Sequence, residues 1–270
     1  MPAPAPSWTP PPCECEYAFP HGAERAEALW RRFPAPVGYR RVSAEPNGFA
    51  CWLRGLPLKS PTAPVLLYDG TRKSYQSACA AILDIDVGES DLQQCADAVV
   101  RLRAEYLFSR ELDSRIEFSA TNGQLLSYAR WKRGERPVLR GSRIVWSRSG
   151  SPGRSWRSFR AFLDFVFGYA GTISLKRDTK AIPVDQVQAG DLLVQAGSPG
   201  HAVIVLDTCQ AQDGKGKLAL LAQGFMPAQS LHVLRNLADS ELSPWYDLAA
   251  SEEVVTPQWT FKRGDLRRFR

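Results

Sequence analysis

The chain has 270 residues and a formal net charge of +6 at pH 7. This length is enough for one sizeable core, and a composition of 44% hydrophobic and 23% charged residues is ordinary for a globular protein. No apolar run approaches the ~18–20 residues that span a bilayer, which excludes a membrane-spanning helix.

The first half of the chain contains a proline-rich start and one strong helix signal. We expect a disordered tail over residues 1–20, a short helix and linker over 21–37, and a single α+β domain over 38–270. Ser90 or Asp91 offers a capping box for a helix that carries apolar residues at helical spacing. Strands are expected before this helix, at 65–68 and 78–87.

The second half contains a hairpin, a second helix and then short strands. Asn122-Gly123 predicts a hairpin within residues 116–126, because this dipeptide suits a tight β-turn. Ser155 is a good N-cap for a helix with an apolar face, and from Pro183 onward short strands dominate. The chain is therefore predicted to be one α+β domain without internal repeats.

Basic residues are concentrated between residues 130 and 160. This segment has ten basic side chains and one acid, or +9, while the rest of the chain is at −3. Tryptophans lie between the arginines, a composition typical of polyanion-binding surfaces. The candidate anion-binding residues are Arg130, Lys132, Arg133, Arg140 and Arg143. A solvated hairpin with scattered arginines is the alternative, and no motif predicts specific binding of nucleic acid.

Three residues form the pattern of a cysteine-based catalytic site. Cys95 falls near the start of the predicted helix, where the helix dipole favours a thiolate. His201 opens a strand after Gly200, and Gln223 ends the next strand. An imidazole beside the thiol would act as a base, and an amide oxygen would hold the ring in one tautomer. Gln93 or Gln94 would add an oxyanion or substrate-positioning group.

Each of these residues also has a structural interpretation. Cys95 lies on the apolar side of its helix and is of a type common in cores, and Cys79 is a rival nucleophile. His201 is also compatible with a strand-edge histidine bonded to a backbone carbonyl, and Gln93 with a capping residue. No histidine or cysteine cluster has metal-ligand spacing, so neither a metal nor a cofactor is expected.

Two resemblances are carried by quoted stretches of this sequence. Residues 188–225, with a Gly-Asp turn before the histidine strand, resemble the bacterial NlpC-type cell-wall cysteine peptidases and their CHAP amidase relatives. The wider chain, from about residue 38 to the end, resembles the bacterial domain-of-unknown-function family 4846. The stretches that carry this second resemblance are Trp52–Arg54, Asp91–Asp97, Arg101–Tyr106, Pro199–Val205, Ala222–Gln229 and Pro244–Tyr246.

The first resemblance implies a papain-like α+β core in which a helix packs on an antiparallel sheet, with the hairpin and the second helix inserted. It implies a cysteine peptidase or amidase, a hydrolase acting on peptidoglycan peptides or a related envelope amide. In this family Asp-Cys-Ser-Gly surrounds the nucleophile, whereas Cys95 is followed by Ala96 and Asp97. The compartment is then the cell envelope or periplasm if a leader has been trimmed, and the cytoplasm otherwise.

Two other interpretations compete with this one. The chain could be a non-catalytic binding module that uses the segment 130–160 to hold an anionic polymer, or its fold could be unrelated to the papain-like one. The sequence leaves the oligomeric state open.

Overall fold

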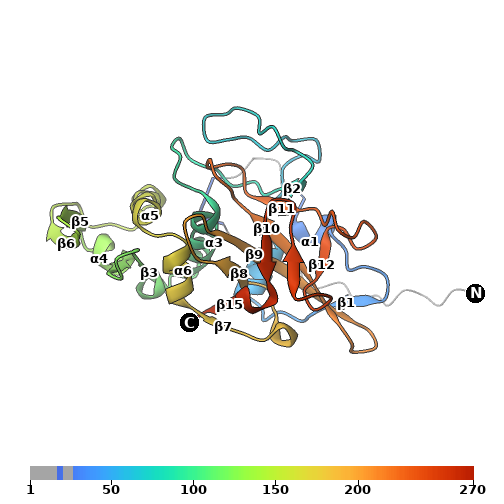
Figure 1. The fold of residues 1–270 in the computed structure, drawn as a ribbon. Coiled ribbons are helices and arrows are strands. Elements are labelled where there is room, and N and C mark those ends of the chain that lie inside the picture. Colours follow the sequence, from blue (N-terminus) through green and yellow to red (C-terminus); the bar gives the residue numbers. More distant parts are fainter. Residues whose placement is uncertain (1–16, 21–26) are drawn as a thin grey trace, which may run out of the picture.

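The structure, a computed structural model, describes residues 17–20 and 27–270 (Figure 1). Most of the predicted tail over 1–20 lies outside the described residues, as does the start of the helix predicted over 21–37. The described chain is a mixed α+β fold with a large antiparallel sheet and a few helices. None of the helices within these residues combines the length and apolar character needed to cross a bilayer.

A nine-stranded sheet is the largest unit of the described residues. Its long strand, β9, pairs antiparallel with β8 on one side and with β10 on the other. The strands follow the order β2 (Cys79–Ile82), β11 (His232–Leu234), β10 (Lys217–Gln223), β9 (His201–Ala211), β8 (Leu192–Gln195), β15 (Leu266–Phe269) and β7 (Thr179–Ala181); β1 (Tyr39–Arg41) also pairs with β9 and β12 (Trp245–Asp247) with β10.

Both faces of β9 are buried, and its first half after His201, residues 202–206, is entirely apolar. Ala202, Ile204 and Leu206 pack in the core shared with α3 (Cys95–Ser109), and α2 (Phe49–Arg54) contacts the same strand. Val203 and Val205 belong to a second core on the other face, which includes residues of the two-stranded pair β13 (Glu253–Val255) and β14 (Thr260–Lys262). A continuous apolar run is what a doubly covered strand requires.

A second group of elements lies beside the sheet, on the left of Figure 1. It contains two hairpins and two helices, and it includes the basic segment. The elements are β3 (Glu117–Ser119), β4 (Leu125–Ser127), α4 (Tyr128–Lys132), β5 (Glu135–Arg140), β6 (Arg143–Arg148) and α5 (Trp156–Tyr169). The remaining helices are α1 (Leu29–Arg32) and α6 (Thr172–Asp178), with 3-10 turns at Asp113–Arg115, Val184–Gln186 and Arg263–Asp265.

The local signals for the hairpin and the second helix are confirmed. β3 and β4 enclose the predicted turn, with Gly123 at a φ of +88°, and the Ser155 side chain accepts a hydrogen bond from Ser158 N–H at the start of α5. The capping box predicted at Ser90 or Asp91 is wrong. Helix α3 begins at Cys95, because the carboxylate of Asp97 accepts from the N–H of Gln94, the actual N-cap.

Candidate functional site

His201 is the first residue of β9, and its ring is almost completely buried, at 1% exposure. Its Nε2 lies 2.8 Å from Oε1 of Gln223, the last residue of β10. The antiparallel pairing of β9 and β10 brings these strand ends together. The two residues that the sequence places on adjacent strands are therefore in direct contact, while their catalytic role stays a prediction.

The hydrogen bond continues into a chain that fixes the tautomer of His201. Lys73 Nζ, which as an ammonium can only donate, lies 2.7 Å from Oε1 of Gln258. The same oxygen accepts from Nε2 of Gln223 at 2.9 Å. The oxygen of Gln223 therefore faces the ring, so that Nε2 of His201 is the protonated nitrogen and Nδ1 the acceptor.

The Nδ1 atom of His201 is free to accept a proton. It makes no hydrogen bond with the described residues, and it is not among the fully buried polar atoms that lack a partner. Burial lowers the pKa of His201 to about 4, although the hydrogen bond to Oε1 of Gln223 opposes part of this shift. The ring is therefore a neutral base at pH 7.

Aromatic side chains enclose the ring of His201. The ring centroids of Phe225, Trp259 and Phe261 lie 5.0, 5.3 and 5.7 Å from that of the imidazole. Trp259 is itself held by a hydrogen bond from its Nε1 to Oε1 of Gln195, on β8. This enclosure keeps water from the His201–Gln223 bond, which strengthens it.

Cys95 is the first residue of α3, and its thiol lies at the backbone N–H of Ala202, the residue after His201. Gly224, which follows β10, lets the start of α3 lie close to the end of that strand, because a Cβ there would lie 2.9 Å from the backbone oxygen of Gln94. Burial, together with a smaller effect of the nearby Asp97, raises the pKa of the thiol to about 11, although the N–H of Ala202 opposes part of this shift. The structure thus brings a protonated Cys95 to the same end of β9 as His201, with no hydrogen bond between the two side chains among the described contacts.

The predicted oxyanion residues have different surroundings. Gln93 is fully buried, and its amide binds Arg101, Arg160 and the backbone oxygen of Asp86. Gln94 is the N-cap of α3, and its amide nitrogen donates to the carboxylate of Asp91. The side chain of Gln93 is therefore held in an ionic network, whereas Gln94 lies next to Cys95 at the start of α3.

The predicted anion-binding residues divide into two groups. Arg130 and Arg133 pair with Glu135, and Lys132 pairs with Asp113. Arg140 and Arg143, in contrast, are exposed at the end of the β5–β6 hairpin and have no acidic partner among the described residues. Only part of the basic segment is therefore available to a ligand.

The surroundings of His201 are completed by Lys73, Gln258 and Trp259. The sequence analysis assigned no role to Lys73 or Gln258. Lys73 and Gln258 are 185 residues apart, in segments without helical or strand periodicity, so no local pattern marks them. Burial lowers the pKa of Lys73 to about 8.

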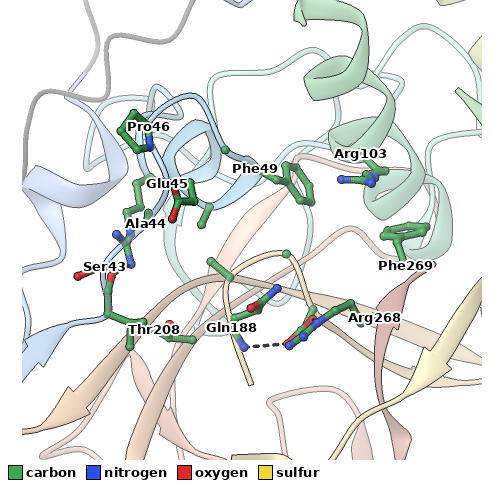
Figure 2. A pocket seen from close by; sticks show the side chains of 17 residues that line it. Ser43, Ala44, Glu45, Pro46, Phe49, Arg103, Gln188, Thr208, Arg268 and Phe269 are labelled. Carbon is green, nitrogen blue, oxygen red and sulfur yellow. Dashed lines mark hydrogen bonds and ion pairs between the residues drawn. The ribbon is translucent and has the colours of Figure 1, made fainter. Parts of the chain in front are cut away.

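A cavity of about 550 Å³, shown in Figure 2, is lined by residues other than those around His201. It is lined by residues near Thr208, seven positions along β9 from His201, and by the end of β15. Its Arg268 pairs with Asp191, and its Arg103 lies over the ring of Phe269. Within the described chain, no group of three or more histidine, cysteine or acidic side chains is arranged to hold a metal ion.

Comparison with known proteins identifies a family but no relative of known activity. A search of curated proteins and a search of solved structures gave no match. A family profile described as "Domain of unknown function (4846)" matches residues 29–268, which is most of the chain. The protein therefore belongs to this domain-of-unknown-function family.

Proposed function

We propose that the chain is a cysteine-dependent acyl-transfer enzyme, an amidase or peptidase with a papain-like site. Cys95 is the nucleophile, His201 the base, and Gln223 the residue that orients the ring. The observation that carries the proposal is the chain of hydrogen bonds that leaves Nδ1 of His201 as a proton acceptor. The next residue, Ala202, binds the Cys95 thiol through its backbone N–H.

The reaction follows from these proton positions. The sulfur of Cys95 attacks the substrate carbonyl while its proton passes to Nδ1 of His201, because both groups are neutral at rest. Nδ1 then protonates the departing amine, leaving a thioester. Water attacks the thioester and gives its proton to Nδ1, the acid is released, and the proton returns to the sulfur. Backbone N–H groups in the first turn of α3 face the developing oxyanion.

The substrate class rests on the resemblance described above. The sequence around His201 is similar to that of NlpC-type and CHAP enzymes, so cell-wall peptides or a related envelope amide are the first substrates to test. A non-catalytic module that holds an anionic polymer through the segment 130–160 is less well supported, since Arg130, Lys132 and Arg133 are paired internally.

The test is the rate of alkylation of Cys95 by iodoacetamide, followed peptide by peptide by mass spectrometry. Cys79 is an internal control, since it is also a free thiol with a pKa raised to about 11 and is more exposed than Cys95. If exposure alone set the rate of alkylation, Cys79 would react faster than Cys95. The proposal expects Cys95 to react faster between pH 5 and 8, because His201 takes its proton.

Two variants decide whether His201 causes this reactivity. His201→Ala and Gln223→Ala should slow the alkylation of Cys95 at pH 6–7 and leave that of Cys79 unchanged. If Cys95 reacts more slowly than Cys79 in the wild type, or if the variants change both thiols equally, the catalytic pair is refuted.

A further inference from the structure

The hairpin formed by β5 and β6 has two different faces. Its strands pair residue by residue, with Arg140 opposite Arg143 and Val138 opposite Val145, and they are joined by a turn in which Gly141 has a φ of +59°. Leu139 and Ile144 alternate with these pairs and point to the other side, where Ile144 is buried in the core. We call the side with Val138, Arg140, Arg143 and Val145 the outer face.

The outer face combines exposed aliphatic groups with unpaired charge. Val138 is 43% and Val145 is 46% exposed, although they form a cross-strand pair that would suit a core. Arg140 and Arg143 are the adjacent pair towards the turn. The hairpin lies at the end of the side group that is farthest from the sheet in Figure 1.

This arrangement costs stability in the isolated protein. Like charges directly opposite each other on two strands repel, and neither arginine has an acidic partner among the described residues. At the base of the same hairpin, Glu135 pairs with both Arg130 and Arg133. The arginines at the base of the hairpin therefore share an acidic partner, whereas the two at its tip have none among the described residues.

The combination identifies the chemistry of the partner. A second copy of the chain would bring the arginine pairs of both copies together, which is unfavourable. A soluble polyanion would be attracted by the arginines but would leave the two valines in water. An anionic lipid surface satisfies both, since its phosphates bind the arginines and its acyl chains contact the valines.

We propose that the outer face of the β5–β6 hairpin docks on an anionic lipid surface. Arg140 and Arg143 bind lipid phosphates, and Val138 and Val145 enter the boundary between headgroups and acyl chains. The hairpin is presented by packing of its inner face, through Ile144 and Trp146, against the core of the domain.

The test is co-sedimentation of the full chain with vesicles of phosphatidylcholine, with or without phosphatidylglycerol, at low and high salt. We expect binding only to the vesicles with phosphatidylglycerol. Arg140→Gln/Arg143→Gln should lower the partition coefficient about fivefold for each arginine removed. Val138→Thr/Val145→Thr, which keeps the shape and strand preference of the side chains, should lower it about threefold for each valine.

Matched controls remove the same groups elsewhere on the surface. Arg72→Gln/Arg110→Gln removes two exposed arginines, and Val255→Thr removes a valine that is 50% exposed on β13. These variants should bind as the wild type does, and circular dichroism verifies that every variant is folded. The proposal is overturned if the wild type fails to bind the anionic vesicles, or if the controls lose as much binding as the hairpin variants. Loss with the arginine variant alone, together with retention on heparin, identifies a soluble polyanion as the partner instead.

Discussion

Replacement of Arg101 should destabilise the protein strongly, because this arginine is a charged side chain with no exposed surface. Its guanidinium binds Glu105 at 3.0 Å, Gln93 at 2.6 Å and the carboxylate of Asp86 at 2.7 Å. Glu105 is 1% exposed as well, whereas the Asp86 side chain is 38% exposed and remains partly solvated. The pair with Glu105 therefore decides the magnitude.

Arg101→Met leaves Glu105 buried without its counter-ion. Breaking a buried pair in this way costs about 3–5 kcal/mol, whereas the exposed side of the network adds little. For a chain of this size the melting temperature should fall by roughly 10 °C. Urea unfolding at pH 7, followed by circular dichroism, measures the change in the free energy of unfolding.

The double variant Arg101→Met/Glu105→Leu tests the cause. It removes the stranded carboxyl and should regain more than half of the lost stability. Burial already raises the pKa of Glu105, and loss of Arg101 raises it further. The single variant should therefore lose stability as pH rises, because the unfolded state releases this proton first. The reasoning would be refuted if the free energy of unfolding of the single variant lay within about 1 kcal/mol of that of the wild type, or if the double variant were less stable than the single one.

Two further predictions concern pH. Burial lowers the pKa values of His201 and His232 to about 4. The free energy of unfolding should therefore fall as pH drops from about 6.5 to 4, by on the order of 3 kcal/mol for each histidine. A free energy of unfolding in urea that stays constant over this pH range contradicts the prediction. Burial raises the pKa of Asp97 to about 8, so its contribution to stability is lost as pH rises towards 8. Asp97→Asn should therefore unfold at higher urea concentration than wild type at pH 9, and an equal midpoint speaks against a protonated Asp97.

The parts of the fold that could be predicted are those with a local cause. The turn at Asn122-Gly123 and the N-cap at Ser155 are formed by residues within three positions of each other, and both are found. The helix start at Ser90 or Asp91 has an equally good local pattern and is wrong. The carboxylate of Asp91 accepts instead from the N–H of Ala228, 137 residues away, so a long-range contact displaces the cap.

The same distinction applies to the candidate site. Gly200, His201 and the end of β10 stand out in the sequence, because each is a polar or small residue at the end of an apolar strand. Lys73 and Gln258 have no such mark, and they become neighbours only through the tertiary fold. The expected strand at 65–68 forms only isolated bridges, of Leu66 with Arg72 and of Leu67 with Gln229.

The chain of hydrogen bonds from Lys73 to His201 makes the tautomer of the histidine depend on the protonation state of the lysine. Among the contacts of the described residues, the ammonium of Lys73 is the one that determines which way the amides of Gln258 and Gln223 point. Once that lysine loses its charge, at a pH near 8, both amides are free to reverse together, and the two nitrogens of His201 exchange their roles. Titration of Lys73, at the edge of the cluster, therefore permits Nδ1 of His201 to change from an acceptor to a donor without any movement of the backbone.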